Sequence, residues 1–238
     1  MKKILTGIIT LAVAAAVLLF FFPALPKYGY IRITDKYPSL NTELKEYDLS
    51  GVTVPDDLVE IKEEHGLSVK IAPDMKLKED SRYPTYINSD KSAVLIVKYD
   101  ELPPADADEQ FSPATHKQIE KFVKTRNMPV PASQYEFLDF TYSLTYDDFN
   151  IRSLSDEKIF RKLAESKEEL FEATSGAYSF HSGDNCGFVE CLGKKENAER
   201  YAVSLYTGDA HENSFMVIIS SEDIGLAKQM IASIKIEK

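Results

Sequence analysis

One short window of this sequence combines the side-chain types of a nucleophilic site. His181, Asp184 and Cys186 lie within six residues, and a cysteine beside a histidine and a carboxylate can become an activated thiolate. The same window has the composition of a tight turn, because Gly183 accepts a positive φ and Asn185 can supply local hydrogen bonds. We interpret it as a hairpin turn whose histidine and cysteine are structural. The alternative is an envelope enzyme with its site between His181 and Cys186.

The other histidines and the densest acidic segment do not form a metal-binding pattern. His65, His116 and His211 lack the mutual spacing of metal ligands. Asp106–Glu109 is similar to the start of a calcium loop, but Phe111 stands where such a loop needs glycine. Hydrolase and nucleotide-binding motifs are also missing from the sequence. We therefore predict no metal, no cofactor and no catalytic residue.

The two cysteines are predicted to be unpaired with each other. Cys186 and Cys191 flank an apolar run that reads as a strand. Five extended steps would hold their Cα atoms roughly 16 Å apart, beyond the limit of about 7 Å for a disulfide. Their odd spacing also predicts side chains on opposite faces of a sheet.

The first 26 residues predict a membrane anchor. Lys2 and Lys3 precede the uncharged run Ile4–Leu25, which at about 1.5 Å per residue can span the roughly 30 Å hydrocarbon core of a bilayer. The small-residue site Ala12–Ala14 lies inside the run, and a cut at the end of the run would place the bulky Phe22 where a small residue is needed. We predict a retained signal anchor with the lysines in the cytoplasm and the rest of the chain outside. Cleavage would instead produce a secreted protein.

Charge limits the partners of the remaining chain. The whole sequence has a net charge of −10, and its first 26 residues carry two lysines and no acidic residue, so the rest has a net charge of −12. Nucleic acid and anionic lipid are therefore poor partners for the outer surface as a whole. We expect a protein or another envelope component as the partner.

We divide the chain into residues 1–26 as stub and anchor, 27–65 as a tether with partial local structure, and 66–238 as one domain. Within the domain, Leu67, Val69 and Ile71 alternate with polar residues as in a half-buried strand. The expected elements are strands at 67–71, 85–87 and 93–99, a helix after the cap Ser112, a helix at 153–173 capped by Ser155, a four-strand meander around 178–180, 188–192, 201–206 and 215–219, and a terminal helix at 222–234.

The aromatic segment between the two middle helices is ambiguous. Tyr135, Leu138, Tyr142, Tyr146 and Phe149 recur at helical spacing. We favour a helix here, although a strand remains an alternative. Aromatic stripes of this kind usually face the core, and lining of a ligand groove is the other interpretation. With strands early, helices midway and strands late, the order of elements predicts an α+β fold with a mostly antiparallel sheet packed with helices.

Three segments carry a resemblance to a known group of domains. GLSVKIAPDMKL, SAVLIVKYDEL and the closing AKQMIASIKIE, with Met230–Lys235 its most suggestive part, resemble the PsbP-like and DcrB-like domains over Gly66 to Glu237. The resemblance implies an α/β/α sandwich, attachment to a membrane or export, and a role as a binding or assembly factor without shared catalytic residues. Met75 stands where this group commonly has a tryptophan. Together these observations predict a membrane-anchored, non-enzymatic binding or assembly module of the cell envelope.

Overall fold

The computed structural model describes residues 35–63, 66–98, 113–148, 154–207 and 213–236. The segment Ile4–Leu25, predicted to be an anchor, lies outside these residues, as do Ser112, His65, His211 and Asp106–Glu109. Within the described part of the chain, no helix has both the length and the apolar character needed to cross a membrane.

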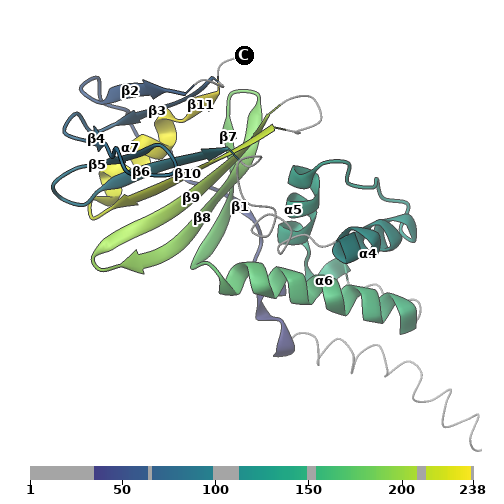
Figure 1. The fold of residues 1–238 in the computed structure, drawn as a ribbon. Coiled ribbons are helices and arrows are strands. Elements are labelled where there is room, and N and C mark those ends of the chain that lie inside the picture. The colour runs from purple at the N-terminus through teal and green to yellow at the C-terminus, as the bar shows by residue number, and fades with distance from the viewer. Residues whose placement is uncertain (1–34, 64–65, 99–112, 149–153, 208–212, 237–238) are drawn as a thin grey trace, which may run out of the picture.

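The described residues form an α+β fold built on an eight-stranded sheet (Figure 1). The strand order is β1-β7-β8-β9-β10-β6-β5-β4, and every neighbouring pair is antiparallel except β1 with β7. The strands are β1 (Lys45–Glu46), β4 (Lys76–Leu77), β5 (Thr85–Ile87), β6 (Ala93–Lys98), β7 (Gly176–Ser182), β8 (Asn185–Lys195), β9 (Ala198–Thr207) and β10 (Asn213–Ser221). The predicted early hairpin and late meander are therefore confirmed.

Turn residues explain why the meander folds locally. The β7–β8 turn is a two-residue loop in which Gly183 has a φ of +61°, and the β8–β9 turn places Glu196 at +57°. Two-residue hairpin loops require such left-handed conformations because only they match the twist of the flanking strands. The predicted turn at 182–185 is thus confirmed.

One face of the large sheet is covered by the C-terminal helix and a small second sheet. Helix α7 (Ile224–Ser233) contacts both β10 and β3, and the small sheet has the order β11-β3-β2 with β11 (Lys235–Ile236), β3 (Leu67–Ile71) and β2 (Val59–Lys62). Asp223 caps α7 by accepting hydrogen bonds from the Gly225 and Leu226 backbone amides. Residues on both layers form the main core, including fully buried Leu67, Val69, Val203, Val217, Met230 and Ile231.

The other helices gather beside β7 and β8 (Figure 1). They are α4 (Pro113–Lys124), α5 (Gln134–Ser143) and α6 (Leu154–Glu172). Phe122 of α4 packs on Phe160 of α6, while Tyr142 of α5 packs on Phe188 of the sheet. The helical interpretation of the aromatic segment is therefore confirmed up to Ser143. The predicted cap Ser155 lies inside α6, because the helix already begins at Leu154.

The segment before β1 is packed against α6. The short 3-10 helix η1 (Pro38–Asn41) buries Leu40 and the preceding Tyr37 in the core formed by α4 and α6. The Tyr146 hydroxyl donates to the Tyr37 carbonyl at 2.9 Å. In Figure 1 this purple segment runs alongside α6 and then reaches the sheet edge as β1. This segment therefore connects the helices to the edge of the large sheet.

Candidate functional site

The hairpin turn places His181 opposite Cys186 and leaves Asp184 in an exposed position. His181 and Cys186 are directly opposed partners of β7 and β8, whereas Asp184 is exposed within the turn itself. Nδ1 of His181 lies 3.7 Å from the Glu46 carboxylate of β1. Asp139 of α5 is a carboxylate that interacts electrostatically with both Cys186 and His181.

The surroundings of Cys186 oppose the formation of a thiolate. Burial raises the pKa of its thiol, and a hydrogen bond with the side chain of Tyr135 opposes that shift. Asp139 of α5 is also close enough to raise the pKa of Cys186, and burial raises the pKa of this carboxyl in turn. A nucleophilic cysteine needs a lowered pKa, so this environment is that of a structural thiol. The sequence placed Tyr135 in the aromatic segment but did not connect Tyr135 or Asp139 with Cys186, because they come from a different element.

The second cysteine lies on the opposite face of β8. Cys191 packs on the core beneath α7 with Tyr201 opposite it in β9, whereas Cys186 faces Tyr135 of α5. The two cysteines do not form a disulfide with each other. This agrees with the prediction from their odd spacing.

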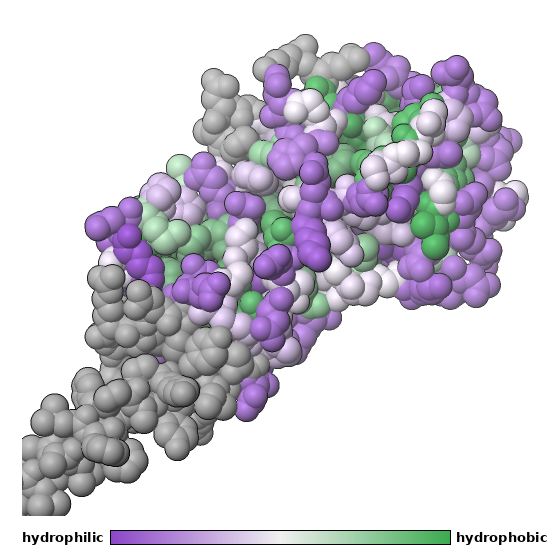
Figure 2. All heavy atoms as spheres, turned by 180° about the vertical axis from the view of Figure 1, so that it is seen from behind, coloured by the Kyte–Doolittle hydropathy of each residue, from purple (hydrophilic) through white to green (hydrophobic). Residues whose placement is uncertain are grey.

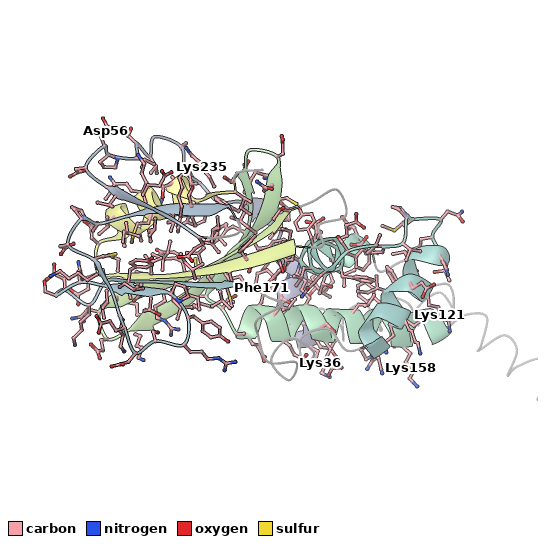
Figure 3. The ribbon with its side chains drawn as sticks, turned by 45° about the horizontal axis from the view of Figure 1, so that its top comes forward. Lys36, Asp56, Lys121, Lys158, Phe171 and Lys235 are labelled. Carbon is pink, nitrogen blue, oxygen red and sulfur yellow. The ribbon has the colours of Figure 1, made fainter. Side chains whose placement is uncertain are left out.

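A surface cavity of about 520 Å³ lies where the segment before β1 meets β7 and the end of α6. Its aromatic wall is formed by Phe171 and Tyr178, and Figure 3 shows Phe171 where α6 meets the sheet. A Cβ added to Gly176 would come within 3.3 Å of the Tyr178 ring, so the glycine leaves room for that ring. Polar residues complete the lining: Asn41, Thr42, Glu43, Lys45, Thr174 and Ser175.

A buried cation lies behind the wall of this cavity. Lys167 of α6 has no exposed surface, and its ammonium group donates to the Thr42 carbonyl at 2.7 Å and to the Leu144 carbonyl at 2.6 Å. It also lies 5.4 Å from the centre of the Phe171 ring. Burial lowers the pKa of Lys167 to about 8, against the opposing effects of the Asp148 and Glu168 carboxylates.

Lys167 carries a sequence signal that the analysis above did not use. It stands four residues after Leu163 and three before Leu170, both on the apolar side of the helix. A lysine at such a position is expected to be buried with its ammonium group hydrogen-bonded. The cavity wall formed by residues 41–45 had no comparable signal, because β1 has only two residues.

A second hollow follows along the same sheet edge. It has a volume of about 430 Å³ and lies between residues 46–50 and the end of β7, where Phe180 and His181 form its wall. The Asp48 carboxylate there accepts hydrogen bonds from the backbone and hydroxyl of Ser50, which lower its pKa. Both hollows therefore border residues 41–50, which lead from the helices to the sheet.

The remaining described surface offers less definite features. Figure 2 shows hydrophobic residues between hydrophilic ones on the rear of the molecule, and the large apolar side chains that are exposed include Val59, Leu77 and Ile224. Within the ranges that the structure describes, no group of three or more histidine, cysteine or acidic residues could hold a metal ion.

Comparison with protein-family models and with curated proteins found no match for this chain.

Proposed function

We propose that this protein is a non-enzymatic binding or assembly module, held at the outer face of a cell membrane, that takes its ligand or partner at the β1–β7 edge. The observation that carries the proposal is the cavity between residues 41–45, the end of α6 and β7. Ligand sites are typically concave, with apolar walls and a few polar groups that fix orientation. Phe171 and Tyr178 supply the apolar wall, and Lys45 supplies a polar group.

Two features support binding over chemistry. The candidate nucleophile Cys186 has a raised thiol pKa, and Asp184 lies at an exposed position of the turn. An activated site would combine a nucleophile with a nearby base of matched pKa. The hairpin is therefore assigned a structural role, and the edge cavity takes the functional one.

The proposed architecture is an α/β/α sandwich of the PsbP-like and DcrB-like type. Its support is the placement of α7 on one face of the large sheet and of α5 against the other. In that group of domains, binding and assembly roles are common. A partner protein or envelope ligand is accordingly the proposed occupant.

The proposed location rests on the run Ile4–Leu25 as a retained transmembrane anchor. Nine residues lie between Leu25 and Asp35, the first described residue, and the ten Cα-to-Cα steps between them span at most about 36 Å when extended. The cavity wall begins at Asn41, shortly after that link. An anchored domain would thus hold this edge close to the outer membrane surface.

Site-specific photo-crosslinking in intact membranes tests the proposal. A photoreactive amino acid replaces the exposed Asn41 at the cavity rim, and Ser175→Trp fills the cavity from an exposed position. We expect one defined adduct that disappears in Ser175→Trp. The matched control Ser89→Trp, in the exposed turn before β6, should leave the adduct intact. An adduct unaffected by Ser175→Trp would contradict a site in this cavity.

A further inference from the structure

We infer that the edge cavity takes a small organic anion, a carboxylate or phosphate attached to a flat or chain-like apolar body. This inference rests on the proposed function and adds the chemical class of the ligand. It is carried by the buried ammonium group of Lys167 behind an aromatic wall that is open to the surface.

The apolar body is accommodated by the aromatic wall. Phe171 and Tyr178 are both half-buried, so each ring presents part of its surface to the cavity. Ala177 belongs to the same apolar cluster as Phe171 and adds a further apolar residue to the lining. A flat ring or an acyl chain would bury apolar surface against these residues.

The charge of the ligand follows from three charged side chains. Glu43 and Lys45 both line the cavity and both are exposed, so water screens them and their net charge is zero. Lys167 is fully buried and is screened least. The Asp148 and Glu168 carboxylates also act on Lys167 but do not line the cavity, so Lys167 is the buried charge that contacts the cavity wall.

Lys167 is not neutralised by a carboxylate at contact distance. Its described hydrogen-bond partners are the carbonyl oxygens of Thr42 and Leu144, and it forms no ion pair with a described acidic residue. A buried positive charge satisfied only by carbonyl dipoles still attracts an anion nearby. Since Thr42 and Phe171 belong to the cavity wall and both contact Lys167, the anionic group would lie close to this charge.

Three probes with the same ring test the inference. Phenylphosphonate, benzyl alcohol and benzylammonium differ mainly in charge, and their binding to the full chain in phosphatidylcholine nanodiscs is measured by saturation-transfer NMR and calorimetry, with empty nanodiscs as blanks. Phenylphosphonate should bind about tenfold or more tightly than benzylammonium, the size of one charge-assisted interaction. Equal affinities for the three probes would overturn the inference.

Two variants and one direct measurement test whether the lysines at this cavity cause the preference for an anion. Lys45→Gln and Lys167→Met should weaken the binding of phenylphosphonate and leave the binding of benzyl alcohol unchanged. The control Lys235→Gln, which changes an exposed lysine on β11, should alter the binding of neither probe. If Lys167→Met does not fold, NMR of labelled lysine decides: the pKa of Lys167 should rise when phenylphosphonate saturates the wild-type protein. An unchanged pKa would contradict the proposed contact.

The two proposals fail separately. Equal probe affinities together with a crosslink that Ser175→Trp still abolishes would reject the anion and retain the binding site. A crosslink that Ser175→Trp does not affect would reject the site itself.

Discussion

The ammonium nitrogen of Lys167 lies 2.7 Å from the carbonyl oxygen of Thr42, a residue 125 positions earlier in the sequence. The same nitrogen binds the Leu144 carbonyl, which follows α5. Ser39 adds a second link, because its backbone amide donates to the Glu168 carboxylate at 3.0 Å. These contacts fix the segment that leads into β1 against α6, and they shape one wall of the edge cavity.

Replacing this buried lysine should destabilise the protein. Lys167→Met leaves the Thr42 and Leu144 carbonyls without their donor, while relief of a buried charge offsets part of the loss. We expect a net fall of about 1–3 kcal/mol in the free energy of unfolding, measured by urea denaturation. Lys162→Met, at an exposed position of the same helix, should change it by less than about 0.5 kcal/mol. Equal effects would contradict the structural role of Lys167.

The pH dependence of stability should also depend on Lys167. Its pKa of about 8 in the folded protein lies below the value of 10.5 for a free lysine, so the folded state binds this proton less tightly than the unfolded state. The contribution of Lys167 to stability should therefore grow as the pH rises from 8 to 10.5, by about 3 kcal/mol. Subtracting the Lys167→Met curve from the wild-type curve isolates this effect from the tyrosines and cysteines. A difference between the two curves that does not change with pH would contradict this expectation.

The half-buried Glu190, which faces α5 from β8, should behave in the opposite sense. The Tyr142 hydroxyl donates to Glu190, and burial raises the pKa of that carboxyl above its usual value. The folded state therefore binds the proton more tightly, and stability is lost as the pH rises above the normal range of a glutamate. Glu190→Gln keeps an acceptor for Tyr142. It should raise the free energy of unfolding by on the order of 1 kcal/mol at pH 7 and leave it unchanged at pH 4. Glu172→Gln, at an exposed position, is the control.

Helix α7 offers a matched pair of isoleucines. Ile231 is fully buried in the main core, while Ile224 at the helix start is 47% exposed. Ile231→Asp places a charge without a partner in the core and should cost at least about 4 kcal/mol or prevent folding. Ile224→Asp should lower the thermal midpoint by only a few degrees. Similar midpoints for the two variants would be inconsistent with the packing of α7.

The sequence predicted elements whose signals are local. Gly183 and its polar neighbours specified the β7–β8 turn, and alternation at Leu67, Val69 and Ile71 specified β3. The cap predicted at Ser155 was wrong, because residue types that cap helices also occur inside them. Such signals depend on a few adjacent residues, which is why they survive without knowledge of the tertiary fold.

The cavity could not be predicted in the same way. Its walls come from residues 41–45, the end of α6 and the start of β7, and β1 is recognised only by its pairing with β7. The contact between Tyr135 and Cys186 likewise joins α5 to β8. Which residues meet across such distances depends on packing, and periodicity in one sequence does not contain that information.

The proposal of a binding module is tested most directly by comparing two variants in the Asn41 crosslinking assay. Ser175→Trp blocks the cavity, whereas Cys186→Ser removes the thiol that a nucleophilic enzyme would need while keeping a side chain of similar size. We expect loss of the adduct in Ser175→Trp, and an unchanged adduct and unchanged cellular phenotype in well-folded Cys186→Ser. An adduct that survives Ser175→Trp, together with a phenotype lost in folded Cys186→Ser, would contradict it and favour an enzyme centred on the hairpin.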